Sequence, residues 1–410
     1  MIESSSFWFI LLGSVIVFWT LPLRARFWFL ALVSIAYLAT MSPRDVKIHS
    51  YAHAAILVAL ALLGYAFAGR TSVRSNWPAW LRRTVFWMLV AFPLGYLLFA
   101  KYVVPSSWFH GTLIRAYAVP LGISYICFKL IHMIVESARD PSKTSRLDTY
   151  LSNLFLFPTD AAGPIERYDH FLKNTSPRVA SDDILQGFTR IIYGLIKRFV
   201  IVEALFADAW RFVTHGALPE RLALLSPLVM WKLSLYAFLY LYLDFSAYSD
   251  IAIGCCRLFG IRIMENFDWP ILAPNIAVFW RRWHMTLTGW CTSYVYMPLV
   301  GLTRKLGLAT FVTFIVIGLW HGTAKSTLPW VLWGIYHGVG MLFYQYWARL
   351  KRFYKWAWCE HWLWYGAGVA ITLLFVSLGT FIALAEPTSF GQAGNILRQM
   401  TVPPRHHAAS

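Results

Sequence analysis

The sequence predicts an all-α, polytopic integral membrane protein with about 10–12 membrane helices and additional short re-entrant and interfacial helices. Two observations lead to this prediction. Hydrophobic residues make up 58% of the chain and charged residues only 13%, whereas a soluble domain carries about 25% charged residues. Apolar runs also recur along most of the 410 residues. An ordinary soluble enzyme is therefore nearly ruled out, and so is a disordered chain.

Ten apolar runs are candidate membrane spans, and we expect each to be helical because a helix satisfies its backbone polar groups internally. Several are shorter than the roughly 20 residues that a straight span needs, so tilted or re-entrant segments are expected. The ten runs are residues 7–22, 26–42, 51–69, 84–104, 113–136, 186–208, 222–243, 306–322, 327–347 and 362–385.

Two segments interrupt the apolar runs. Residues 137–185 are polar and proline-containing, and residues 261–305 are aromatic, basic and punctuated by three prolines. Such stretches are typical of short helices that lie at the interface or re-enter the core. We therefore divide a single membrane domain into four predicted parts. These are N-terminal helices (1–136), a polar or re-entrant connection (137–185), a membrane core (186–347), and a C-terminal helix with a polar tail (348–410).

The basic residues carry information about topology. The chain has 36 Lys and Arg residues against 19 Asp and Glu residues, for a net charge of +17. These basic residues are scattered between the apolar runs, which favours contact with the lipid bilayer and disfavours a nucleic-acid partner. The first and third predicted loops together hold six basic residues, and the second holds two. The positive-inside rule then places the N-terminus outside and the first loop in the cytoplasm.

Several common catalytic and metal-binding patterns are missing from the sequence. It contains no Walker A loop, no GxSxG elbow, no GxGxxG after a strand and no HExxH. The five cysteines show no CxxC spacing, and the cysteines and histidines form no metal signature. We therefore expect no bound metal and no bound cofactor. The informative residues are the polar ones inside apolar segments, where burial is expensive.

His321 is the first of these residues, at the end of the run 306–322 between Trp320 and Gly322. Imidazole is the side chain best suited to move a proton near pH 7. Gly318 and Gly322 allow close approach of another backbone or of a ligand. The alternative is an interfacial histidine that only donates a hydrogen bond.

His284 lies in the stretch FWRRWHMTLTGW, directly after Arg281, Arg282 and Trp283. In a helix, Arg281 and His284 would be i,i+3 neighbours and share one face. A cation beside the imidazole favours the neutral form that a general base needs. The alternative is an amphipathic interfacial helix with an ordinary basic face.

Three further polar residues lie in or beside apolar runs. His337 lies in VLWGIYHGVGML, where the small residues favour close helix packing and the histidine can be a packing residue. Asp244 and Asp250 bracket DFSAYSD at the end of an apolar run. A carboxylate at that depth needs a partner, and Ser246, Tyr248 or a nearby arginine are candidates. We expect structural pairing for both aspartates, with a catalytic role as the alternative.

A set of short motifs follows in order along roughly residues 115–345. The motifs are PLGIS (120–124), FPTDAAGPIERY (157–168), DFSAYSDIAIG (244–254), ENFDWP (265–270), FWRRWHMTLTGW (279–290), YMPLVG (296–301), GLWHG (318–322) and WGIYHG (333–338). Together they resemble the motifs of the membrane-bound O-acyltransferase family, in particular its bacterial branch of alginate O-acetylase membrane subunits and teichoic acid D-alanyl transfer proteins.

This resemblance implies an O-acyltransferase of the bacterial cytoplasmic membrane, with its helices around a central catalytic tunnel in the core 186–347. His321, in the WHG motif, corresponds to the residue regarded as catalytic in the family, and His284, in the RRWHxxL motif, to its second functional histidine. Substrate-binding or supporting roles would fall to Arg281, Arg282, Trp320, Asp244, Asp250 and His337.

The resemblance also implies the partners. An acyl thioester, either acetyl-CoA or an acyl carrier, would be the co-substrate, and a hydroxyl of a surface polymer would be the acceptor, with a periplasmic or surface acyl-transfer protein as a possible partner. The motifs DFSAYSD, ENF and YMPLVG resemble those of polysaccharide acetylases, whereas HMIVE (132–136) and FPT (157–159) resemble those of D-alanyl transfer proteins. Acetyl transfer to an extracytoplasmic polysaccharide is the first expectation, and D-alanyl transfer toward teichoic acid from a carrier-protein thioester is the second. A transporter or lipid-binding scaffold is the rival class, but it leaves the ordered motifs unexplained.

Overall fold

In the computed structural model, every regular element among the described residues is helical. The described residues are 4–40, 47–104, 122–143, 146–176, 178–216, 222, 224–356, 362–387 and 389–401. Part of the predicted span 113–136, the first residues of the PLGIS motif and the tail 402–410 lie outside them. The chain forms two compact units, which are residues 1–195 with 247–265, and residues 196–246 with 266–410. The predicted division into four parts stays a prediction.

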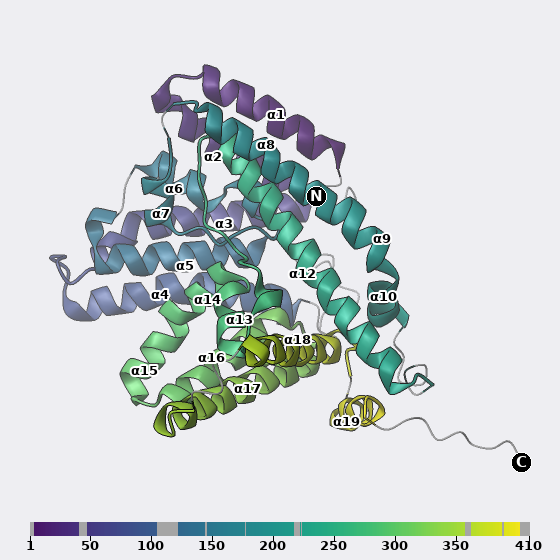
Figure 1. Ribbon diagram of the computed structural model, residues 1–410. Helices are drawn as coiled ribbons and strands as arrows, with labels where there is room; N and C mark the ends of the chain where they lie inside the picture. Colours follow the sequence, from purple (N-terminus) through teal and green to yellow (C-terminus); the bar gives the residue numbers. More distant parts are fainter. Residues whose placement is uncertain are drawn as a thin grey trace, which may run out of the picture. The chain divides into compact units, whose positions relative to one another are not determined.

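The first unit is built mainly from helices that follow one another along the chain (Figure 1). It also takes in the C-terminal end of α12 (Pro227–Leu258). Its other elements are α1 (Ser5–Thr20), α2 (Leu23–Thr40), α3 (Lys47–Phe67), η2 (Ala68–Thr71), α4 (Ala79–Leu98), η3 (Phe99–Val103), α5 (Ile123–Arg139), η6 (Pro141–Lys143), α6 (Leu147–Leu154), η7 (Phe157–Thr159), α7 (Tyr168–Lys173) and α8 (Ser181–Leu195).

The second unit begins where α8 passes into a π-helical segment and contains the rest of α12. Between residues 266 and 284 it is made of short helices and turns, as the prolines there predict, whereas residues 285–303 are helical without a break. Its elements are η8 (Ile196–Val202), α9 (Glu203–Leu205), α10 (Ala207–Arg211), η9 (Phe212–Gly216), η10 (Pro270–Leu272), α13 (Ile276–Arg282), α14 (Met285–Cys291), η11 (Thr292–Tyr296), α15 (Met297–Thr303), α16 (Leu306–His321), α17 (Thr327–Phe353), α18 (Trp362–Leu384) and α19 (Phe390–Gln399).

The protein is a polytopic membrane protein. Among the described residues, five segments are long and apolar enough to cross a bilayer: 23–40, 51–71, 79–103, 227–258 and 362–384. Each overlaps a span predicted from the sequence. The predicted spans 7–22 and 306–322 correspond to α1 and α16, which are apolar helices of 16 residues each. Large apolar side chains such as Phe9 and Ile371 are about two-thirds exposed or more, as lipid-facing side chains must be.

The predicted end of the span at residue 243 is wrong. Helix α12 is 32 residues long and ends at Leu258, so it carries Asp244 and Asp250 within it. Each carboxylate is paired within its own unit, because Arg198 Nε lies 3.0 Å from Asp244 Oδ1 and Arg190 Nη2 lies 2.7 Å from Asp250 Oδ1. Pairing lowers the cost of placing a carboxylate inside an apolar helix, so the helix can continue past the first aspartate.

The core of the first unit combines aromatic packing with a buried ion pair. Phe7, Phe157 and Phe259 are fully buried and pack edge to face. Beside them, Lys129 Nζ lies 3.3 Å from Asp160 Oδ1, and both side chains are buried. The same ammonium donates to the carbonyl of Asn153 at 3.2 Å and to Thr159 Oγ1 at 3.1 Å. The charge of Lys129 is therefore compensated inside the unit, as burial requires.

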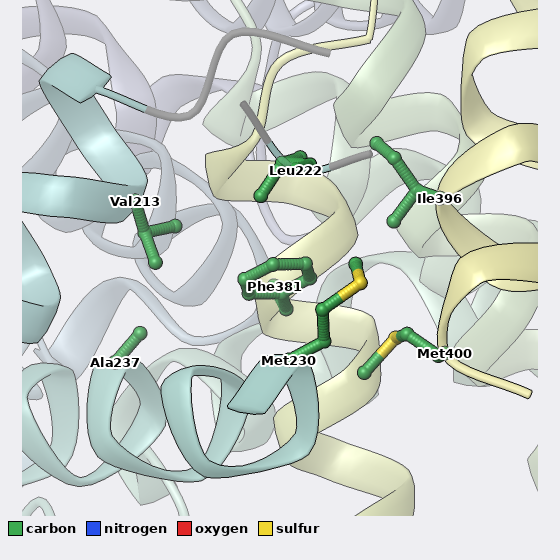
Figure 2. Packing of buried hydrophobic residues seen from close by; sticks show 7 residues of the cluster. All are labelled: Val213, Leu222, Met230, Ala237, Phe381, Ile396 and Met400. Atoms are coloured by element: carbon green, nitrogen blue, oxygen red, sulfur yellow. The ribbon is translucent and has the colours of Figure 1, made fainter. Parts of the chain in front are cut away.

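The second unit has an apolar core where α12, η9, α18 and α19 meet (Figure 2). Phe381 of α18 lies among side chains from the other elements, and Met230 and Met400 approach it from α12 and from the end of α19 (Figure 2). The buried residues of this cluster are Val213, Leu222, Met230, Ala237, Phe381, Ile396 and Met400. This cluster anchors α18, which packs against α17 and so against the helix that carries His337.

Helices α16 and α17 pack with their backbones in contact, and two glycines make this possible. A Cβ atom on Gly318 would lie 2.3 Å from the carbonyl oxygen of Trp330, and one on Gly334 would lie 2.7 Å from that of Phe314. Any larger side chain would push the two helices apart. The close packing predicted for these small residues is confirmed, and it brings the end of α16 against the start of α17.

Candidate active site

His321 is the last residue of α16 and lies against the first turn of α17. Its ring is stacked on Trp330, with a centroid separation of 4.6 Å and an interplanar angle of 18°. Trp320 lies at 4.4 Å and Trp333 at 5.8 Å on other sides of the imidazole. The stacked indole therefore fixes the plane of the imidazole.

The aromatic surroundings of His321 continue inward to His337. The rings of Trp333 and His337 are 4.4 Å apart, and Trp280 of α13 lies 5.2 Å from His337. His337 is 1% exposed, and neither of its ring nitrogens has a hydrogen-bond partner among the described residues. A Cβ atom on Gly379 of α18 would lie 2.7 Å from its Nε2. His337 is therefore a tightly enclosed residue behind the tryptophans that contact His321.

His284 lies at a sharp turn between α13 and α14 and not on one continuous helix. Its φ of 42° and ψ of 53° are left-handed, which is uncommon for a residue with a side chain. The expectation that Arg281 and His284 share a helix face is therefore wrong. The helix ends at Arg282, and the turn leaves Arg281 exposed while it buries His284 to 2% exposure.

Asn266 fixes the orientation of His284. His284 Nδ1 lies 2.9 Å from Asn266 Oδ1, which also accepts a hydrogen bond from Thr286 Oγ1 at 2.9 Å. The backbone of the same asparagine accepts from Met285 N at 2.8 Å, so it also holds the turn. Because Asn266 Oδ1 is an acceptor, His284 Nδ1 carries the proton, and the opposite nitrogen, Nε2, is then an acceptor in the neutral ring.

The two histidines belong to one aromatic cluster in the second unit. Trp320 connects them, with its ring 6.3 Å from that of His284 and 4.4 Å from that of His321. Phe245 of α12 contacts the imidazole of His284 edge to face at 4.7 Å. The structure therefore brings together two histidines that are 37 positions apart in the sequence.

The two arginines before His284 differ in their surroundings. Arg282 Nε lies 3.7 Å from Asp268 Oδ2, and the Arg282 carbonyl accepts from Asp268 N at 3.0 Å. Arg281 is exposed and has no hydrogen-bond or ion-pair partner among the described residues. The positive charge of Arg282 is therefore partly engaged by an exposed carboxylate, whereas that of Arg281 is available to an anionic group.

Asp244 forms an ion pair with an arginine of η8, and Asp250 forms one with an arginine of α8. Arg198 bridges Asp244 and Glu203, at 3.0 and 2.7 Å. Arg190 bridges Asp250 and Glu265, at 2.7 Å each. Arginine was one of the partners expected from the sequence. Asp250 and Arg190 belong to the first unit, whereas Asp244 and Arg198 belong to the second unit.

Sequence reasoning missed three residues of the cluster. Both tryptophans lie on the first turns of α17. Trp330 has the pattern of an ordinary apolar helix position, and Trp333 was noted only as the first residue of the WGIYHG motif. Asn266 was noted only as part of the ENFDWP motif, although it is fully buried. A polar amide between Glu265 and Phe267 in an otherwise aromatic motif was the available signal, because a buried amide needs hydrogen-bond partners.

Comparison with known proteins identifies the family. The model of the membrane-bound O-acyltransferase family matches residues 19–384. The chain is 32% identical over 286 residues to the teichoic acid D-alanyltransferase of Bacillus subtilis, covering 65% of this chain and 69% of that protein. It is 31% identical over 260 residues to the probable alginate O-acetylase AlgI of Pseudomonas aeruginosa, covering 60% of this chain and 48% of that one.

A third relative matches over a longer stretch. The teichoic acid D-alanyltransferase of Lacticaseibacillus rhamnosus is 27% identical over 350 residues, which cover 80% of this chain and 82% of the relative. The match therefore extends over about half of the alginate O-acetylase and over most of the D-alanyltransferases. The family model covers nearly the whole chain, and the chain belongs to the membrane-bound O-acyltransferase family.

Proposed function

We propose that this O-acyltransferase moves an acyl group from a thioester to a hydroxyl group, with His321 as the general base. The observation that carries the proposal is the contact between His321, Trp330 and Trp320, in one cluster with His284. A histidine is suited to the task because its proton affinity is close to neutral pH. The family membership supports acyl transfer over the transporter or scaffold alternative.

The reaction would proceed by direct attack. His321 accepts the proton of the acceptor hydroxyl as its oxygen bonds to the thioester carbonyl carbon. The carbonyl oxygen takes up the negative charge, and the C–S bond breaks when the carbonyl re-forms. The leaving sulfur receives the proton from the His321 imidazolium, so the histidine returns to its neutral state. General-base assistance of this kind contributes about 10²–10⁴ in rate.

Trp330 would stabilise His321 at the moment when it is charged. The near-parallel stack at 4.6 Å places the imidazole over the indole face. When the ring becomes an imidazolium, the negative face of the indole attracts it, an effect worth about 0.5–2 kcal/mol. Trp330 would thereby assist proton transfer without itself reacting.

His284 would orient the acceptor. With its Nδ1 proton donated to Asn266, the neutral ring offers Nε2 as a hydrogen-bond acceptor, which suits a hydroxyl group of the acceptor. It does not suit an oxyanion, which needs a donor. Backbone N–H groups or Arg282 would then stabilise the oxyanion. Arg282 is partly engaged by Asp268.

Acetyl transfer to an extracytoplasmic polysaccharide is the first candidate reaction, with a cytoplasmic thioester such as acetyl-CoA as donor. The aromatic side chains around His321 suit a neutral acetyl group. The loop charges support an orientation with the N-terminus outside, so that donor and acceptor approach from opposite sides of a bacterial inner membrane. A periplasmic or surface partner protein would complete delivery to the polymer.

D-alanyl transfer from a carrier-protein thioester is the second candidate. It is favoured by the longer matches to the two D-alanyltransferases. An alanyl group carries an ammonium, which would have to be accommodated by cation–π contact with the tryptophans around His321.

The test uses the full chain in native membranes, supplied in parallel with labelled acetyl-CoA and with labelled D-alanyl carrier protein. We expect label in a hydroxyl-bearing polymer from one donor, and at least a 100-fold loss with His321→Gln. The matched control is His170→Gln. His170 lies outside the cluster, and its imidazole pairs with Glu166. Transfer by His321→Gln at the rate of the wild-type protein would refute the assignment. Vectorial flux of a substrate without acylation would refute the reaction class.

A further inference from the structure

A basic cavity lies in the first unit where α3 and η2 lead into α4. Its volume is about 430 Å³, and it is open to the surface. Two arginines, two serines and an asparagine contribute polar groups, and none of the lining residues is acidic. The residues are Gly69, Arg70, Arg74, Ser75, Asn76, Pro141 and Ser142. Such a lining is complementary to an anion that accepts several hydrogen bonds.

The loop that carries most of this lining is held in place by Arg82. One nitrogen of its guanidinium, Nη1, donates to the carbonyl oxygens of Val73 at 2.6 Å and Ser72 at 3.3 Å. Within the loop, Arg74 N donates to Ser72 Oγ and Trp77 N donates to Ser75 Oγ, at 3.3 Å each. The loop is therefore tied to the first turn of α4, and the cavity does not depend on a ligand for its shape.

The charges of Arg70 and Arg74 are not compensated. Neither guanidinium has an ion-pair partner within the described part of the chain. Arg70 lies over the rings of Phe67 and Trp77, at 5.6 and 6.0 Å, so its charge is positioned without being neutralised. A rigid, positioned guanidinium loses little freedom when it binds an oxyanion.

The carboxylates nearest in the sequence to Ser142 are already engaged. Asp140 Oδ1 accepts from the backbone and side chain of Ser142, at 3.2 and 2.8 Å. Glu136 Oε1 accepts from Arg139 at 2.8 Å. Both carboxylates are therefore hydrogen-bonded, and neither forms an ion pair with Arg70 or Arg74.

The cavity lies at a membrane boundary. Its lining includes the end of the candidate span 51–71 and the connection from that span to the candidate span 79–103. Trp77 lies in the connection between these spans and Trp80 in the first turn of α4, and tryptophan is enriched at the depth of lipid headgroups. We propose that Arg70 and Arg74 bind the phosphate of an anionic phospholipid headgroup in this cavity, with the hydroxyl group of Ser75 as a further donor.

The test measures lipid retention by the purified full-length protein. The wild-type protein and Arg70→Gln/Arg74→Gln are mixed with equal amounts of phosphatidylglycerol and phosphatidylcholine, and retained lipid is counted by native mass spectrometry. We expect the preference for phosphatidylglycerol to fall by about 10- to 30-fold in the double variant, since each interfacial arginine contributes roughly five-fold. The matched control is Arg24→Gln/Arg83→Gln, which removes the same charge from two exposed arginines of the same unit.

An equal loss of preference in both double variants would overturn the proposal, because net charge alone would then explain lipid binding. A second arm adds glycerol 3-phosphate or inorganic phosphate to the lipid-loaded protein. If millimolar amounts of either displace the lipid, the cavity is a site for free phosphate and the lipid assignment is wrong. Thermal unfolding of both variants verifies the fold, and the measurement does not depend on acyl transfer.

Discussion

Lys129 of the first unit and His321 of the second have opposite surroundings. In the first, Lys129 and Asp160 are fully buried, and the ammonium is bonded to Asp160, Thr159 and the carbonyl of Asn153. In the second, His321 lies among tryptophan rings, with one indole stacked on the imidazole. A group compensated on several sides has no capacity left for a substrate, whereas an indole face stabilises an imidazole that takes up a proton. The first arrangement is structural, and the second is suited to chemistry.

The largest expected effect is on stability in the first unit. Lys129→Met leaves Asp160 buried without its counter-ion, and breaking a buried pair costs about 3–5 kcal/mol. Thermal unfolding of the detergent-solubilised protein should show a large drop in Tm. The double variant Lys129→Met/Asp160→Leu should recover most of it, because no uncompensated charge remains. If the single variant is as stable as the double variant, the pair does not stabilise the unit.

Asn266→Ala should lower activity by about 10- to 100-fold, because it removes the acceptor that holds His284 Nδ1 and leaves a buried donor unsatisfied, a loss of about 1–3 kcal/mol. The measurement is the initial rate of acyl transfer per folded protein. Thr286→Val is the matched control, since it removes only the second hydrogen bond to the same Oδ1 atom. Equal rates for both variants would contradict an orienting role for Asn266.

Trp330→Leu removes the ring stacked on His321 and should reduce kcat by about 3- to 30-fold, corresponding to the loss of 0.5–2 kcal/mol of cation–π stabilisation. Trp330→Phe should be affected less, because it keeps an aromatic face. The control is Trp347→Leu on the same helix, whose ring packs on Trp356. A normal kcat for Trp330→Leu with a raised KM would assign Trp330 to binding and not to proton transfer.

The smallest expected effect concerns pH and stability. A hydrogen bond from Arg262 lowers the pKa of Asp183 below its ordinary value. The stability from this carboxylate is therefore present above the unfolded-state pKa of about 4 and is lost as the pH falls through the folded-state pKa. Because Arg262 is about half exposed, solvent screens the pair, and Asp183→Asn should cost no more than about 1 kcal/mol at neutral pH.

The measurement for Asp183 is Tm between about pH 3 and pH 7. The wild-type protein should lose its advantage over Asp183→Asn toward the acidic end. Asp208→Asn is the control, because that carboxylate is fully exposed and lies 3.5 Å from Arg211. A difference between wild type and Asp183→Asn that is constant over the whole range would contradict the pairing.

The sequence was sufficient for the membrane class, five of the spans and the position of His321, because long apolar runs and a lone imidazole are local signals. It was not sufficient for the turn at His284. A left-handed residue other than glycine has no reliable local signature, and the hydrogen bonds that hold this turn come from Asn266, 18 positions earlier. The extension of α12 through Asp244 was missed because Arg198 lies far away in the sequence.

The arginine partners of the two aspartates also could not be identified from the sequence. The aspartates required partners on grounds of burial, and arginine was among the candidates, but only the packing of α8 and its π-helical continuation beside α12 selects Arg190 and Arg198. Pairing between residues far apart in the sequence depends on tertiary geometry, whereas an apolar run can be recognised from the residues of one segment alone.

The most direct test of the contrast between the two units is the rate of acyl transfer per folded protein, measured side by side for His321→Gln and Lys129→Met/Asp160→Leu in native membranes. The account predicts that the first variant is folded and loses at least about 100-fold in rate. It predicts that the second keeps a rate close to that of the wild-type protein. A folded His321→Gln variant with full activity would contradict the central claim that His321 is the general base.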